Sequence, residues 1–352
     1  MEKYTSKAIT GLQSLLVEKE ADLVTLFSIS FEKKLIDLIT KSDVVHIHSA
    51  YNLIKIEKLP NFLNIQSMFY TLHDLRFLTG GCHYPGKCDG YKSKCNKCPL
   101  VRSGFQSNIM KNLALERDVL RNSNRNYFIS PSKWIESEFR KIPDFKNSSI
   151  KVIPNIVNTN SVATQILSLR EKMQVSEKEF IVAFIAANVT YPLKGFNDFI
   201  SAIIDLRQNF GSRRIRSISI GLGNTNSFTF PEGHLHLGGV SSDEIKEIMK
   251  EINLLVVPSL EENYPNVIIE ALLAGTRVIG SDVGGIPEIL DNFGMSSFKP
   301  RDIKTISKLI WEELLSVESD RSSISIKASD IYDSSKLAKN TIAYYESTLT
   351  NG

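Results

Sequence analysis

The sequence predicts an α/β protein with two domains, each built on a parallel sheet. The main evidence is a repeated pattern in which short apolar runs alternate with amphipathic helical segments, which is typical of buried parallel strands joined by helices. At 352 residues the chain is long enough for two hydrophobic cores. Hydrophobic residues make up 42% and charged residues 23%, which indicates a globular protein.

Composition also narrows the classes of function. The formal net charge of +3 is too small to indicate a nucleic-acid-binding protein. No apolar run reaches the length of a membrane-spanning helix, and residues 1–10 lack the apolar core of a signal peptide. We therefore expect a cytoplasmic protein, either free or docked peripherally on the inner face of the cell membrane.

The first predicted domain covers residues 1–158. Helices are expected over 5–20, 31–39 and 108–121, and a helix capped by Ser132 follows. The expected strands are 44–48, 66–72, 127–130 and 151–153. We expect His46 and His48 to point to opposite faces of their strand, which would prevent them from binding one ion together.

The second predicted domain covers residues 176–330, after a polar segment at 158–179 that marks the boundary. Its expected strands are 180–186, 217–220, 234–237, 254–257 and 276–280, with Phe298 closing the sheet. Helices are expected over 196–206 and 302–317. The C-terminal segment 331–352 should contain a helix at 335–348 that crosses back onto the first domain.

One stretch, residues 254–285, organises the second domain. An apolar strand ends at Pro258, and a helix over 266–274 begins just after Pro265, where a missing N–H costs nothing. Glu262 lies in the loop between them, and Glu270 is the only charge on an otherwise apolar helix. A carboxylate in that setting needs polar partners or a ligand, unless it lies in the first turn and points to water.

This stretch resembles the signature of the retaining GT-B glycosyltransferases of family four. The match covers Pro258, Ser259, Glu262, Glu270, Ala271, Gly275, Val278, Gly284, Gly285, Pro287 and Glu288. The resemblance implies two Rossmann-like domains facing a cleft and a nucleotide-sugar donor, a GDP- or UDP-hexose, held by the second domain. It assigns Glu262 to the donor sugar and Glu270 to the ribose of the nucleotide.

The same resemblance assigns the remaining donor contacts. Lys194 and Gly195 correspond to the family's Lys-Gly for the donor diphosphate, and a cation at a helix N-terminus is otherwise disfavoured unless an anion lies there. Asn188 stands where the family carries an Arg, and Asn158 where it carries an Asp, so both depart from the pattern. The other implied donor-binding residues are Asn266, Val267, Gly284 and Gly285.

His73 ends the strand 66–72 and carries the family's match for a His close to the transferred sugar. The alternative interpretation is a polar anchor for the loop that follows, with Asp74 beside it. We favour the substrate-facing interpretation because ligands bind at the carboxyl ends of strands in open α/β sheets.

All four cysteines, Cys82, Cys88, Cys95 and Cys98, lie in the segment 80–100. The closing Cys-x-x-Cys is a zinc half-site, so we expect a structural zinc with His83 as a substitute ligand. Ordinary thiols or a redox-labile pair are the alternative, of nearly equal weight. Thr-Leu-His-Asp, Gly-Gly-Cys and the final Cys-Pro resemble a subset of the same family that makes bacterial exopolysaccharide or O-antigen.

Basic residues gather around these cysteines: Lys87, Lys92, Lys94, Lys97, Arg102 and Lys111, against the single acid Asp89. A solvated basic loop explains them, and so does a surface for anionic lipid headgroups or an acceptor diphosphate.

The predicted function is transfer of a hexosyl unit, with retention, to a lipid-linked or free glycan, with no metal needed for the chemistry. The first half resembles the family without its first strand and Gly-bearing loop, so we expect a domain shortened at the N-terminus. An inactive remnant or a donor- or glycan-binding subunit of a split transferase is therefore the alternative. A dehydrogenase is disfavoured because no G-x-G-x-x-G joins a strand to a helix, and bound zinc without donor binding would indicate an interaction module.

Overall fold

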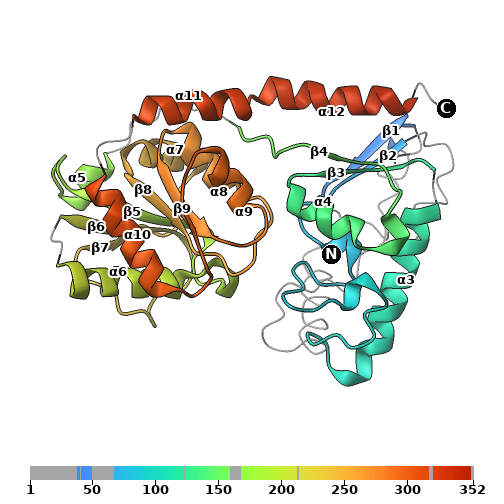
Figure 1. Cartoon of the computed structure of the whole chain (residues 1–352), viewed down its shortest axis with the longest axis horizontal. Helices are drawn as coiled ribbons and strands as arrows, with labels where there is room; N and C mark the ends of the chain where they lie inside the picture. The colour runs from blue at the N-terminus through green and yellow to red at the C-terminus, as the bar shows by residue number, and fades with distance from the viewer. Residues whose placement is uncertain are drawn as a thin grey trace. The chain divides into compact units, whose positions relative to one another are not determined.

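A computed structural model describes residues 38–39, 41–49, 67–122, 124–158, 168–211, 214–316 and 320–349. The contacts between residues divide the chain into a first unit of residues 1–154 and 339–352 and a second unit of residues 155–338. Figure 1 shows the elements of each unit. The helix predicted over 5–20 and all but the end of the helix predicted over 31–39 lie outside the described residues.

Within the described residues, the first unit contains a parallel four-stranded sheet in which neighbouring strands follow chain order. The strands are β1 (Val44–Ile47), β2 (Ser67–Thr71), β3 (Asn126–Ser130) and β4 (Ile150–Val152). All five residues of β2 are buried, which explains its nearly uninterrupted apolar character in the sequence.

Helices α3 (Gln106–Asn122) and α4 (Lys133–Arg140) supply side chains to the core on one face of this sheet. Ser132 caps α4 as predicted, since its hydroxyl accepts a hydrogen bond from the Ile135 N–H. On the other face, Tyr344 and Tyr345 from the end of α12 (Ser334–Leu349) pack against Phe69 of β2. The ring centroids are 5.2 and 4.5 Å apart, in edge-on arrangements that aromatic rings prefer.

The second unit contains a parallel six-stranded sheet in the order β10-β9-β8-β5-β6-β7. The strands are β5 (Phe180–Asn188), β6 (Ile215–Leu222), β7 (His234–His236), β8 (Leu254–Val257), β9 (Arg277–Ser281) and β10 (Ser297–Phe298). Counted from β5, this is the Rossmann order, and the chain reverses direction across the sheet between β5 and β8.

Two hydrophobic cores sandwich this sheet. Side chains of α6 (Phe196–Phe210) and α10 (Ile303–Leu315) fill the core on one face. The core on the other face takes side chains from the remaining helices, which are α5 (Leu169–Met173), α7 (Ser242–Glu251), α8 (Asn266–Leu273), α9 (Ile286–Asn292) and α11 (Arg321–Ile331). Helices on both faces are what a parallel sheet requires, because neither face can be left in water.

The predicted fold class is therefore confirmed: two parallel, Rossmann-like sheets in an α/β chain. Each predicted strand in the described ranges is present, with boundaries shifted by at most a few residues. Within the part of the chain that the structure describes, no helix has both the length and the apolar character needed to cross a bilayer.

Candidate functional site

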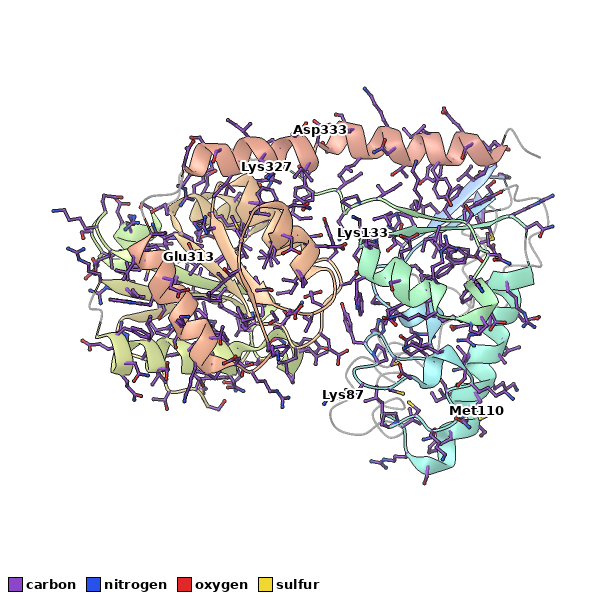
Figure 2. All side chains as sticks on the ribbon, in the orientation of Figure 1. Lys87, Met110, Lys133, Glu313, Lys327 and Asp333 are labelled. Carbon is purple, nitrogen blue, oxygen red and sulfur yellow. The ribbon has the colours of Figure 1, made fainter. Side chains whose placement is uncertain are left out.

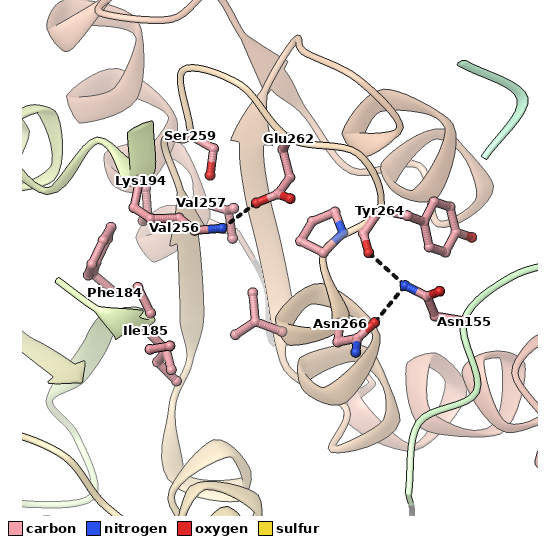
Figure 3. Close-up of a pocket in the computed structure, with 14 residues that line it drawn as sticks. Asn155, Phe184, Ile185, Lys194, Val256, Val257, Ser259, Glu262, Tyr264 and Asn266 are labelled. Carbon is pink, nitrogen blue, oxygen red and sulfur yellow. Dashed lines mark hydrogen bonds and ion pairs between the residues drawn. The ribbon is translucent and has the colours of Figure 1, made fainter. Parts of the chain in front are cut away.

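A cavity of about 300 Å³ opens at the carboxyl ends of β5 and β8 in the second unit (Figure 3). Phe184 to Ala187 from β5 and Val256 and Val257 from β8 form part of its wall. In open α/β sheets, ligands bind outside the strand ends where the strand order reverses, and β5 and β8 are those two strands. The topology therefore makes this cavity the candidate ligand site.

Two of the residues that line the cavity, Lys194 and Glu262, form an ion pair. Lys194 ends the short 3-10 helix Pro192–Lys194, and its Nζ lies 2.6 Å from Oε2 of Glu262 in the loop after β8 (Figure 3). The Glu262 side chain is only 9% exposed, whereas the Lys194 side chain is 34% exposed. The other Glu262 oxygen accepts a hydrogen bond of 3.2 Å from the Asn263 N–H. The anion that the sequence suggested beside Lys194 is thus, in this structure, a carboxylate of the protein.

Two glycines allow close backbone packing around the loops that carry Lys194 and Glu262. Gly195 has φ +74°, and a Cβ there would lie 1.9 Å from the Pro258 carbonyl oxygen at the end of β8. Gly284 has φ +58°, and its Cβ would lie 1.7 Å from the Glu262 carbonyl oxygen. Gly285 donates its N–H to the Asn263 carbonyl at 2.6 Å. Gly284 and Gly285 therefore position the Glu262 loop, and neither is among the residues that line the cavity.

The first turn of α8 also borders the cavity, through Asn266 and Val267. Its N-cap is Pro265, which makes no side-chain capping bond. The amide nitrogen of Asn155 donates to the Tyr264 carbonyl at 3.1 Å and to Oδ1 of Asn266 at 2.9 Å. A helix N-terminus without a capping side chain presents backbone N–H groups that suit an anion.

Glu270 lies about one turn further along α8, at a second cavity of about 460 Å³ that shares Ile185, Ala186, Ala187 and Val267 with the first. Most of the wall of this second cavity is apolar or backbone, and it includes Leu222 and Gly239. Burial raises the pKa of Glu270, and nearby Lys246 opposes the rise. Glu270 is therefore the main polar side chain of an otherwise apolar chamber beside the ion pair.

The side chain of Asn188, in contrast, makes hydrogen bonds within its own turn. Its Oδ1 accepts hydrogen bonds from the Thr190 N–H at 2.9 Å and the Thr190 hydroxyl at 2.8 Å. The side chain is not among those lining either cavity. The position that carries an Arg in the resembling family thus serves here as a turn.

His73 lies in the first unit, at the end of β2, within a cluster of histidines. Its Nε2 is 2.9 Å from Nδ1 of His48, and the rings of His46 and His48 are 4.0 Å apart. The expectation that His46 and His48 point to opposite faces was wrong, because residues two apart on a strand share a face. Burial, reinforced by His48 and His73, lowers the pKa of His46 to about 3.

Burial and His48 also lower the pKa of His73, and Asp74 opposes this shift. Asp74 itself anchors the loop, since its two oxygens bind the Arg76 N–H at 2.8 Å and Nδ1 of His83 at 2.7 Å. The anchoring role that the sequence suggested for this dipeptide thus belongs to Asp74.

The cysteine segment does not form the expected zinc centre. Within the described residues, no group of three or more His, Cys, Asp or Glu side chains could hold a metal ion. Cys82 and Cys95 are buried in the apolar core of the first unit, and burial raises the pKa of Cys82 to about 12. His83, the substitute ligand, is paired with Asp74.

Helix α3 holds this segment by hydrogen bonds instead. Gln106 accepts from the Cys98 N–H at 2.7 Å and donates to the Cys98 and Val101 carbonyls. Arg117 donates to the Ser93 carbonyl at 2.7 Å and to that of Tyr91. In Figure 2, Lys87 marks the segment and Met110 marks α3.

Of the basic residues around the cysteines, Lys92 pairs with Asp89 and Glu138. The exposed members are Lys87, Lys94, Lys97, Arg102 and Lys111.

Three residues with polar side chains in the first cavity were not predicted as site residues: Asn155, Ser259 and Tyr264. Ser259 was part of the matched motif without an assigned role, and Tyr264 directly precedes the helix-starting Pro265. Asn155 carries no local signal, because its partners lie 109 and 111 positions away in the sequence.

Comparisons with known proteins point to one class. Residues 179–312 match the family described as glycosyl transferases group 1. The putative colanic acid biosynthesis glycosyl transferase WcaC of Escherichia coli is 22% identical over 267 residues, which cover 73% of this chain and 62% of that protein. The putative teichuronic acid biosynthesis glycosyltransferase TuaC of Bacillus subtilis is 21% identical, covering 52% and 45%. The chain thus spans less than two thirds of the length of these relatives.

Solved structures agree on the fold. Sucrose-phosphate synthase from Thermosynechococcus elongatus superposes with a TM-score of 0.66 at 16% identity, covering 91% of this chain and 78% of that one. Anabaena HepE in complex with UDP gives a TM-score of 0.65 at 16% identity, covering 89% and 81%. The chain therefore has the GT-B fold, and its residues 179–312 match the glycosyl transferases group 1 family.

Proposed function

We propose that this protein is a retaining glycosyltransferase that moves a hexosyl unit from a nucleotide sugar to a glycan or lipid-linked oligosaccharide, in the synthesis of a surface polysaccharide. The observation that carries the proposal is the Lys194–Glu262 pair at the strand-order reversal of a glycosyl transferases group 1 domain. Relatives named for colanic and teichuronic acid synthesis support the polysaccharide class.

The two adjoining cavities suit the parts of a nucleotide sugar. Lys194 and the uncapped first turn of α8 supply positive charge for a diphosphate. Glu262 offers carboxylate oxygens to sugar hydroxyls in the same cavity. Glu270 can accept from the two ribose hydroxyls, while the apolar chamber beyond it suits a flat base. We propose UDP or GDP as the nucleotide, and the solved HepE complex contains UDP.

The chemistry follows from where charge develops. As the bond from the anomeric carbon to the diphosphate breaks, negative charge grows on the leaving oxygen. Lys194 and the α8 N–H groups are already in place to stabilise that charge, which is the most effective way to lower such a barrier. In the free protein Glu262 neutralises Lys194, so donor binding exchanges a carboxylate for a phosphate at the ammonium. Glu262 is then released to hold the sugar.

We propose that the first unit binds the acceptor. His73 keeps the sugar-facing role that the resemblance assigns, and its burial favours a neutral imidazole. The exposed cations Lys94, Lys97 and Arg102 suit an anionic acceptor or anionic lipid headgroups, which would place the protein at a membrane surface. Co-sedimentation with vesicles of anionic and of neutral lipid tests that placement.

A screen of nucleotide sugars by thermal shift tests the proposal, because a ligand that binds only the folded state raises its melting temperature. UDP- or GDP-hexoses should stabilise the wild type and not Lys194→Met, whereas Lys308→Met, on an exposed lysine of α10, should behave as wild type. NMR of the product should show the donor's anomeric configuration. Binding without transfer to any glycan acceptor would favour a donor-binding subunit, and no binding would end the proposal.

A further inference from the structure

We infer that Asn155 is a positioning residue that sets the first turn of α8 and the loop before it for the donor. The part of this inference that concerns the donor depends on the proposed function. The part that concerns the protein's own geometry does not.

The side-chain amide of Asn155 makes two hydrogen bonds at the N-terminus of α8. Its nitrogen has two hydrogens, and it donates one to the Tyr264 carbonyl and one to Oδ1 of Asn266 (Figure 3). The two acceptors flank Pro265, which has no N–H and provides no capping side chain. Asn155 therefore bonds to the residue before Pro265 and to the residue after it. It fixes the backbone at the start of α8, as an N-cap side chain does in other helices, although Asn155 is distant from α8 in the sequence.

The tied segment is the part of the pocket that faces a diphosphate and a sugar. Tyr264, Pro265 and Asn266 all line the first cavity, and so does Asn155. Glu262 is two residues before Tyr264 in the same loop. A shift at Tyr264 would therefore move both the α8 N-terminus and the carboxylate paired with Lys194.

Asn155 is followed by a residue that is packed into the second unit. It is the first residue of the second unit, three residues after β4 ends at Val152. Two residues later Val157 is 6% exposed and belongs to the core that includes α8. The segment around Asn155 is thus part of the pocket wall within the second unit.

The test uses the full chain in four forms: wild type, Asn155→Ala, Asn155→Asp and the control Asn209→Ala. Asp keeps the size of the side chain and cannot donate, so it should behave like Ala. Asn209 makes a comparable bond of 2.9 Å to Asp205 on α6, away from the pocket. The first readout is amide hydrogen exchange of ligand-free protein over residues 264–273, and the second is the dissociation constant for UDP and for GDP by calorimetry.

We expect exchange over 264–273 to accelerate at least fivefold in both Asn155 variants and to stay at the wild-type rate in Asn209→Ala. The dissociation constant of the nucleotide should rise about five- to tenfold, the loss expected when two ordinary hydrogen bonds no longer hold a binding surface. In an Asn266→Ala background, Asn155→Ala should add less than it does alone, because one of its acceptors is already gone.

The outcomes separate the two claims. If the wild type binds neither UDP nor GDP, the proposed function fails, and the exchange data alone decide whether Asn155 positions α8. Unchanged exchange over 264–273 overturns the positioning role whatever the nucleotide does. Faster exchange with unchanged nucleotide affinity, in a wild type that binds, overturns its role toward the donor.

Discussion

The Lys194–Glu262 pair should respond asymmetrically when either partner is replaced. Lys194→Met removes the ammonium and leaves a Glu262 carboxylate that is 9% exposed and still accepts a hydrogen bond from the Asn263 N–H. Glu262→Gln removes the negative charge, while the Lys194 ammonium, on a side chain already 34% exposed, can turn to water. The cost therefore lies mainly with the lysine substitution, because a stranded buried charge is more expensive than a solvated one.

The magnitudes follow from the exposures. Stranding a fully buried charge costs about 3–5 kcal/mol, and the partial exposure of the lysine reduces this to about 1–3 kcal/mol for Lys194→Met. Glu262→Gln should cost about 0.5–1 kcal/mol or less, in the range of a surface pair.

Urea denaturation of ligand-free protein measures both values, provided that the two units are observed separately. The chain has two tryptophans, Trp134 on α4 and Trp311 on α10, one in each unit. In a Trp134→Phe background, fluorescence therefore reports the second unit alone. A Glu262→Gln cost equal to or above that of Lys194→Met would refute the reasoning, as would a neutral Lys194→Met.

Three other perturbations have expected results. Gly284→Ala, whose Cβ would lie 1.7 Å from the Glu262 carbonyl, should cost at least about 2 kcal/mol more in urea than Gly294→Ala, which has a similar φ of +62° and open space around it. Equal costs would mean that the Glu262 loop is not tightly packed. Because burial raises the folded pKa of Glu270, its ionisation destabilises the folded state, so the stability gained by Glu270→Gln should grow as pH rises above the ordinary value of 4.5. A gain that shrinks over that range in pH-dependent urea titrations would contradict the sign. His46 has a folded pKa of about 3 against an ordinary 6.5, so its neutral form favours folding, and that stability should be lost as pH falls from 6.5 towards 3. His46→Asn should flatten this acid limb in thermal melts, and an unchanged limb would show that the histidine cluster does not control it.

The sheet of the second unit was predictable from the sequence because its central strands, β5 and β8, are mostly apolar and buried. Leu254 to Val257 is fully buried, and α8 begins after Pro265 as its sequence indicates. The pairing of Lys194 with Glu262 was harder to predict, since 68 residues separate them. Only the resemblance of their two motifs to one family placed them in a common site.

Two failures have clear physical causes. The four cysteines suggested a metal by number and spacing, but number and spacing do not define the geometry that a metal requires, and within the described residues no group of three or more His, Cys, Asp or Glu side chains could hold an ion. Asn155 was missed because its chemistry depends entirely on distant partners. An Asn in a loop predicts nothing until the fold shows which carbonyl it meets.

Helix α12 has a consequence for how the protein is made. Its residues from 339 onward belong to the first unit, where Tyr344 and Tyr345 cover Phe69, which is fully buried. Those tyrosines are synthesised about 275 residues after Phe69, long after the strands of the first sheet. The nascent first unit must therefore expose an aromatic surface until α12 has been made, and the end of that helix covers it.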